Sequence, residues 1–168
     1  FDEEYPVLLR QIYLAPPVLY YYGELPDNPV SVGVVGSRRP TLTGKKAAED
    51  ISRKLARSNV CIVSGFANGV DYISHRACIE EKGKTIAVLG SSLEYGISSY
   101  KKKIFDSIKD SGAIISEFPL GTSPKPQHFP MRNRIISGLS DGVLIVEAAR
   151  SEERRVGKEC RSRWSPSH

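Results

Sequence analysis

The stretch VGVVGSRRP, residues 32–40, decides how the rest of the sequence is interpreted. An apolar run ends at Gly36 and is followed by a serine and two arginines, a pattern typical of a buried strand that stops at a glycine turn. In α/β folds such a turn leads into a helix and presents backbone N–H groups to a phosphate. Gly36 lets the backbone approach an anion closely, and the guanidinium groups of Arg38 and Arg39 match phosphate oxygens. Taken alone, the stretch fits a basic surface turn equally well.

Length and composition are those of one globular domain. The chain has 168 residues, of which 40% are hydrophobic and 26% are charged. No apolar run approaches the roughly 20 residues of a membrane-spanning helix. The cysteines (Cys61, Cys78 and Cys160) lack the spacing of a disulfide framework or a zinc site. We therefore expect a cytoplasmic protein without membrane association. The net charge of +5 is small, so any site for a polyanion must be a local feature.

Short apolar segments alternate with amphipathic segments along most of the chain. The expected strands span residues 31–35, 60–63, 85–89, 113–116 and 142–146. The expected helices span residues 41–58, 70–81, 99–109 and 130–139. This alternation predicts an α/β fold, a Rossmann-like three-layer sandwich with a mostly parallel sheet, within residues 30–149. Residues 1–29 are expected to be a lead-in segment packed on this core, in which Tyr20, Tyr21 and Tyr22 form either a strand with alternate rings buried or a stacking surface.

The last stretch, residues 150–168, differs sharply from the rest. It reads RSEERRVGKECRSRWSPSH, without apolar periodicity and with six basic and three acidic residues. It resembles the translation of a common sequencing-adapter DNA, so we interpret it as non-native adapter read-through and expect it to be disordered. The competing interpretation is a basic tail that binds nucleic acid. On the first interpretation, the natural protein continues differently after about Ala149.

The loops that follow the expected strands are predicted to gather at one edge. Parallel strands deliver their following loops to the same side of the sheet, where ligands bind in open α/β folds. The loops span residues 36–40, 64–69, 90–98 and 117–129. The first three open with Gly or Ser-Gly, and this repetition favours an anion site over a basic surface turn.

The second of these loops, SGFANGVD at residues 64–71, has two glycines that permit a tight turn into the next helix. Asp71 falls in the first turn of that helix, where a carboxylate suits the helix dipole or caps the helix. His75 lies four residues later, so we expect the two side chains to meet. An orienting hydrogen bond is favoured over a general-base pair, because no nucleophile is placed nearby.

The fourth loop is the richest in chemistry and reads SEFPLGTSPKPQHFPMRNR at residues 116–134. Lys125 and Phe129 place a cation and an aromatic ring in one stiff, proline-rich segment. Such cations beside an exposed ring are what single-stranded nucleic acid needs, although Phe129 fits a buried helix staple equally well. Arg132 and Arg134 lie two positions apart, so we expect one to face the ligand and the other to form a structural ion pair.

The remaining motifs carry less information. The three lysines at residues 101–103 are typical of a solvated helix face, and contact with a nucleic-acid backbone is the alternative. The chain has no G-x-x-x-x-G-K-[ST] motif, and its first loop lacks the full G-x-G-x-x-G. The histidines are far apart in the sequence, and none pairs with a cysteine. We therefore expect no metal, no cofactor and no catalytic group.

Six ordered motifs resemble those of the DprA/Smf family. They are VGSRRPT, SGFANGVDYISH, TIAVLG, SEFPLG, FPMRNRIISGLS and VLIVEA, and the similarity runs from about residue 5 to residue 149. The resemblance implies an extended Rossmann fold that binds single-stranded DNA during natural transformation, protects it and loads a RecA-type recombinase. It also implies a homodimer that is not primarily an enzyme.

By position, the resemblance assigns the DNA and phosphate site to residues in three loops. They are Gly36, Ser37 and Arg38 in the first, Gly65, Gly69 and Asp71 in the second, and Lys125, Phe129, Arg132, Asn133 and Arg134 in the fourth. It makes residues 30–149 a DNA-binding domain that is incomplete at its C-terminal end. Family members continue past VEA with a stretch that completes the sheet and supports dimerisation, so we expect the dimer region to be missing here.

An alternative function comes from the wider group to which the family is similar. That group includes LOG-type nucleotide phosphoribohydrolases and nucleotide-sensing Rossmann domains. The hydrolases carry a PGGxGTxxE-type loop that supplies a catalytic glutamate near the ribose. The nearest acidic residue in a corresponding place is Glu117, which lacks the neighbouring glycines.

Overall fold

The structure is a computed structural model that describes residues 3–27, 29–95 and 97–148. Its strands are β1 (Tyr20–Gly23), β2 (Ser31–Gly36), β3 (Cys61–Ser64), β4 (Thr85–Val88), β5 (Ala113–Ser116) and β6 (Gly142–Val146). Its helices are α1 (Val7–Arg10), α2 (Leu42–Arg57), α3 (Val70–Glu80), α4 (Ser99–Ser111) and α5 (His128–Gly138). Each expected strand and helix of the alternating part is present within a few residues of its predicted bounds.

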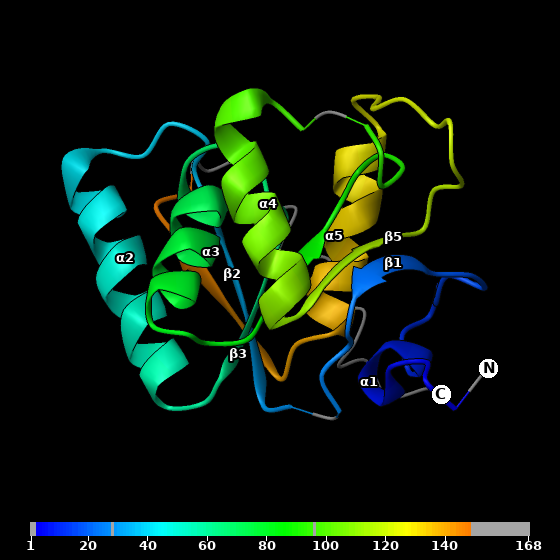
Figure 1. Cartoon of the computed structure of the whole chain (residues 1–168), viewed down its shortest axis with the longest axis horizontal. Coiled ribbons are helices and arrows are strands. Elements are labelled where there is room, and N and C mark those ends of the chain that lie inside the picture. The colour runs from blue at the N-terminus through cyan, green and yellow to red at the C-terminus, as the bar shows by residue number, and fades with distance from the viewer. Residues whose placement is uncertain (1–2, 28, 96, 149–168) are drawn as a thin grey trace.

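The strands form one sheet in the order β1-β5-β4-β3-β2-β6. Neighbouring strands are parallel except at one edge, where β1 pairs antiparallel with β5. Helices α2, α3 and α4 cover one face, and α5 lies on the other (Figure 1). The predicted three-layer α/β sandwich with a mostly parallel sheet is therefore confirmed.

The core has one part on each side of the sheet because successive side chains of a strand point to opposite faces. In β3, Cys61 and Val63 pack in the cluster that includes Ile135 of α5. Ile62, between them, packs instead with α2 and α3. All three side chains are essentially inaccessible to solvent, as expected for a strand covered on both faces.

In the lead-in, Leu9 of α1 is fully buried against the α5 face. The expected alternation of buried tyrosine rings in β1 is wrong. Tyr20 packs against the core beneath α4, but Tyr21 and Tyr22 are 43% and 42% exposed. The reason is that β1 is an edge strand, so neither neighbouring ring is covered by a second layer. Within the described ranges, no helix is long and apolar enough to cross a membrane. The read-through assigned to residues 150–168 lies outside the described residues.

Candidate nucleic-acid interface

The strand order opens a crevice at the carboxyl end of β2. From β2 the chain enters α2 on one face of the sheet, whereas α5 lies on the other face and leads into β6, the other neighbour of β2. Such a switch point is where open α/β sheets bind ligands. A cavity of about 140 Å³ lies there. Six of the residues expected at the site line it, namely Gly36, Arg38, Asp71, Phe129, Arg132 and Asn133.

The backbone of the first loop is largely engaged within the protein. The N–H of Ser37 donates to the carbonyls of Val146 (3.3 Å) and Glu147 (3.1 Å). The N–H and hydroxyl of Thr41, which caps α2, donate to the Glu147 carboxylate at 2.8 and 2.7 Å. The expectation that this loop presents such N–H groups to a phosphate is therefore wrong for Ser37, because the end of β6 lies beside it. The exposed side chain of Arg38 remains as the anion-binding group.

Arg38 and Arg132 both contact the ring of Phe129. The guanidinium carbons lie 5.1 Å and 5.9 Å from the ring centre, within the range of cation–π attraction. The ring is half-buried and stands against Gly90, where an added Cβ would lie 2.9 Å from Cδ1 of the ring. Phe129 is thus held in place by its neighbours while part of the ring stays accessible.

Arg132 lies beneath this ring and is only 4% exposed. Its Nη1 donates to the carbonyls of Gly65 and Val88, both at 2.6 Å, and its Nε donates to Oδ1 of Asn133 at 3.2 Å. A Cβ at Gly65 would lie too close to Nη1 of Arg132, so a side chain there would displace the guanidinium group. Arg132 therefore joins α5 to the ends of β3 and β4.

Asp71 holds the second loop in a turn around its own side chain. Its Oδ2 accepts from the N–H groups of Gly65 (3.1 Å) and Ala67 (3.4 Å). Burial raises the pKa of this carboxyl, and the Arg132 guanidinium opposes the rise. Gly69 has a φ of +81° and lies against the backbone of Ser37 and Arg38, which brings the second loop against the first.

The expected contact between Asp71 and His75 is wrong. The fully buried ring of His75 places Nδ1 2.7 Å from Oγ1 of Thr85. The Thr85 hydroxyl donates to the carbonyl of Ile62, so Nδ1 of His75 carries the proton and donates to Thr85. Burial, together with the charges of Lys101 and Arg132, lowers the pKa of His75 to about 3. His75 is therefore a neutral structural residue.

Two of the expected site residues lie away from the cavity. Arg134 points elsewhere from α5 and forms a bidentate ion pair with Glu117, at 2.7 and 2.6 Å. This confirms that one of the two α5 arginines forms an ion pair. It also engages Glu117, the acidic residue that the nucleotide-hydrolase alternative would use. Lys125 is exposed on the proline-rich loop.

Sequence reasoning missed the role of Lys101, which was placed on a solvated face. The side chain is buried, and its ammonium donates to the carbonyl of Phe66 at 2.7 Å. It also lies 4.9 Å from the Phe66 ring centre and 5.7 Å from that of Tyr72. A signal existed in the sequence, since Lys101, Phe105 and Ile108 have helical spacing and share the buried face of α4.

Positive charge is in excess beside the crevice. Arg132 and Lys101 are both buried, and Asp71 is the buried carboxylate that the structure describes near them. Arg38 adds a further positive charge at the surface. The exposed guanidinium of Arg38 can attract an anionic ligand, because its charge is screened less beside the buried crevice than in open water.

The family model described as DNA recombination-mediator protein A matches residues 1–152. The chain belongs to this family. Among curated relatives, Protein Smf of Synechocystis sp. is 43% identical over 152 residues, which are 88% of this chain and 38% of that protein. The chain spans about half the length, or less, of the curated relatives it matches.

Two solved structures of family members share the architecture. DNA processing protein A (DprA) from Streptococcus pneumoniae superposes with a TM-score of 0.85 and 37% identity, over 96% of this chain and 58% of that one. DprA from Helicobacter pylori gives a TM-score of 0.84 and 29% identity, over 98% and 77%. The latter structure was reported for a unique single-stranded DNA binding mode of that protein. The resemblance seen in the sequence motifs is therefore confirmed.

Proposed function

We propose that this chain binds single-stranded DNA at the carboxyl edge of its sheet, as a binding protein rather than an enzyme. The observation that carries the proposal is Arg38 on the half-exposed Phe129 ring, above the buried Arg132. A cation beside an accessible ring serves both parts of a nucleotide, because the guanidinium binds phosphate and the ring stacks on a base. The family membership and the DNA binding reported for the Helicobacter pylori relative support it.

Some residues of the site would contact DNA, and the others would hold those residues in position. Arg38 would bind a phosphate, and Phe129 would stack on a base. Asn133 already accepts from Arg132 through Oδ1, so its NH2 group is the part that would donate to DNA. Lys125, exposed on the proline-rich loop, would contact the backbone farther along the strand.

The other members of the site would act by support. Gly65 and Asp71 fix the second loop around Arg132, and Gly69 packs that loop against Ser37. Gly36 brings β2 close to the end of β6, where a Cβ would collide with the Val146 carbonyl. Arg134, paired with Glu117, would hold α5 in place and not bind DNA directly.

We further propose that the bound strand is passed to a RecA-type recombinase, and that the complete protein acts as a homodimer. The support for transfer is the family's description as a recombination mediator. A protein that holds DNA mainly by phosphate contacts suits this task, because such contacts do not depend on sequence and yield to competing binders.

The decisive test is the Arg38→Ala variant, titrated with a fluorescein-labelled oligothymidylate by fluorescence anisotropy over a range of salt concentrations. Loss of one charge-assisted contact should weaken binding about tenfold at moderate salt. The slope of log affinity against log salt should fall by about 0.7, the value for one phosphate contact on a single strand. Mixed-sequence oligonucleotides should show the same loss, because phosphate contacts carry no sequence information.

Arg39→Ala is the matched control, because Arg39 is the neighbouring exposed arginine and does not line the cavity. It should retain the parent's affinity and salt slope. If the Arg38→Ala variant binds DNA with the affinity and salt slope of the parent, Arg38 is not part of the DNA site. The enzymatic alternative is tested separately by incubation with nucleoside monophosphates, where we expect no release of free base.

A further inference from the structure

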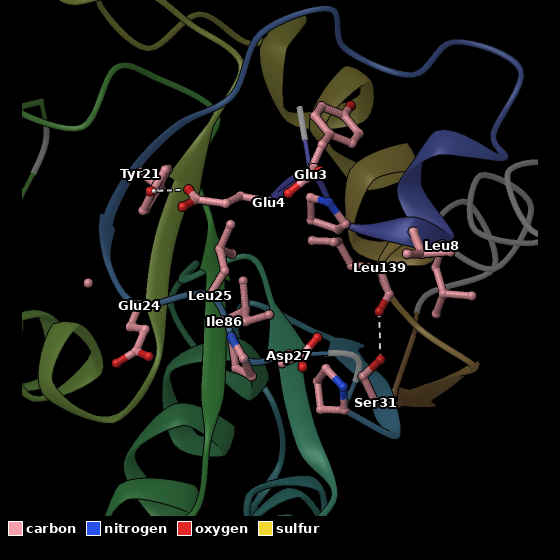
Figure 2. Close-up of a pocket in the computed structure, with 16 residues that line it drawn as sticks. Glu3, Glu4, Leu8, Tyr21, Glu24, Leu25, Asp27, Ser31, Ile86 and Leu139 are labelled. Carbon is pink, nitrogen blue, oxygen red and sulfur yellow. Dashed lines mark hydrogen bonds between the residues drawn. The ribbon is translucent and has the colours of Figure 1, made fainter. Parts of the chain in front are cut away.

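A larger cavity, of about 460 Å³, lies at the opposite end of the sheet (Figure 2). It is bounded by the lead-in segment, the end of β1 and the beginnings of β2 and β4, and we call it the lead-in groove. Its apolar lining includes Leu8, Leu25, Ile86 and Leu139. The volume is within the range of ligand-binding clefts, which is about 300–1,000 Å³.

The rim of the lead-in groove is acidic. The carboxyl groups of Glu3, Glu4, Glu24 and Asp27 belong to its lining, and Figure 2 shows Glu4, Glu24 and Asp27 around Leu25 and Ile86. None of the described residues that line it is Lys, Arg or His. The groove therefore complements a ligand that is both cationic and apolar.

The walls of the groove are held in place by hydrogen bonds and prolines. The Tyr21 hydroxyl donates to Oε2 of Glu4 at 3.2 Å, which joins β1 to the lead-in. Arg10 donates to the backbone carbonyls of Tyr5 (3.1 Å) and Glu3 (3.3 Å), so its side chain fixes the lead-in wall from outside the groove. Three prolines in the lining limit backbone motion further. A groove fixed in this way loses little entropy when it is filled.

The chemistry of the lining selects among cationic ligands. Among the described residues, no group of three or more His, Cys, Asp or Glu side chains could hold a metal ion, so the groove does not fit a bare metal cation. A DNA strand would be repelled by the carboxylates. A hydrophilic cation would leave the half-buried side chains of Leu8 and Leu25 uncovered.

We propose that the lead-in groove binds an extended segment of a partner protein in which basic side chains flank an aliphatic one. The aliphatic side chain would cover Leu8 and Leu25, and the basic side chains would pair with the exposed carboxylates of Glu3 and Glu24. This surface is separate from the DNA site, because it lies at the other end of the same strands. Its occupation therefore does not depend on the proposed DNA binding.

The test uses three short fluorescein-labelled peptides with the same number of residues. One alternates lysine and leucine, one alternates lysine and serine, and one alternates glutamate and leucine. We expect anisotropy to show binding of the lysine–leucine peptide alone, weakened by added salt. The double variant Glu3→Gln/Glu24→Gln should weaken binding about fivefold, since each exposed ion pair contributes little.

The matched control is Asp50→Asn/Asp110→Asn, which removes two exposed carboxylates that lie outside the groove. This variant should bind the lysine–leucine peptide as the parent does. Equal weakening in both double variants would show a general charge effect and overturn the proposal. Equal binding of the lysine–serine peptide would also overturn the proposal, because the apolar side chains of the groove would then have no role. Failure of all three peptides to bind would overturn it as well.

Discussion

His75 shows how burial fixes the charge of a side chain close to the crevice. Its pKa of about 3 lies below the value of about 6.5 expected in the unfolded chain. Between these two pH values the unfolded chain binds a proton that the folded protein does not. Stability is therefore lost as pH falls through this window, by about 2 to 3 kcal/mol between pH 6.5 and 4.5.

The variant His75→Asn tests this effect, because its amide can still donate to Thr85 but does not titrate. Urea unfolding at pH 7 and at pH 4.5 should show a smaller acid-induced loss of stability in the variant than in the parent. All other titrating groups are shared, so the difference between the two losses reports on His75. Equal losses in the two proteins would mean that His75 is protonated in the folded state.

Single residues of the site differ in how far sequence could predict them. Residue type and loop position were enough to place Arg38 and Phe129 at the carboxyl edge of the sheet, because parallel strands deliver their following loops there. The partner of His75 could not be predicted, since Thr85 comes from β4 and adjoins it only in the folded sheet. Glu147 was missed for the same reason, as its contact with Thr41 spans 106 residues.

At the scale of elements, α4 supports the second loop through Lys101. Phe66 has a φ of +56°, a conformation that non-glycine residues rarely adopt, and its carbonyl points to the Lys101 ammonium. The loop that carries Asp71 is thus held from outside by α4 and from inside by its own carboxylate. Burial lowers the pKa of Lys101, which the nearby Asp71 carboxylate opposes.

We expect Lys101→Met to lower the free energy of unfolding by about 1–3 kcal/mol, because the Phe66 carbonyl loses its donor. DNA binding should weaken while its salt slope stays that of the parent, since Lys101 does not contact phosphate. Lys103→Met, on the exposed side of α4, is the control and should change stability by less than about 0.5 kcal/mol. A reduced salt slope in Lys101→Met, as in Arg38→Ala, would instead place Lys101 on the DNA.

Elements were more predictable than contacts because apolar periodicity sets them directly. The strand and helix pattern followed from short apolar runs and helical faces, and family motifs supported it. The direction in which each side chain leaves α5 could not be predicted from these patterns. Arg132 and Arg134 were known to diverge, but only the packed helix shows that Arg132 enters the core and Arg134 meets Glu117.

At the scale of the whole molecule, the two ends of the sheet differ in charge. The carboxyl edge carries Arg38 and Arg132, whereas the lead-in groove carries carboxylates at the other end. DNA should therefore approach one end and be repelled from the other. If both proposals hold, this small domain would bind a nucleic acid and a protein segment at once.

Simultaneous binding is directly measurable. Saturating lysine–leucine peptide should leave the affinity for a labelled oligothymidylate unchanged within about twofold, and the complex should contain both ligands. Arg38→Ala should weaken DNA binding without affecting the peptide, and Glu3→Gln/Glu24→Gln should do the reverse. Competition between peptide and DNA would show that the two ligands share one site.

The contact between Thr41 and Glu147 has a consequence for the order in which the protein matures. It closes the first loop with a carboxylate from a residue 106 positions later in the chain. Contacts of such long sequence separation form late in folding, because closing the intervening chain costs entropy before the contact repays it. During synthesis, the loop that carries Arg38 therefore stays without this contact until Glu147 has left the ribosome. The proposed DNA site would be completed only after that point.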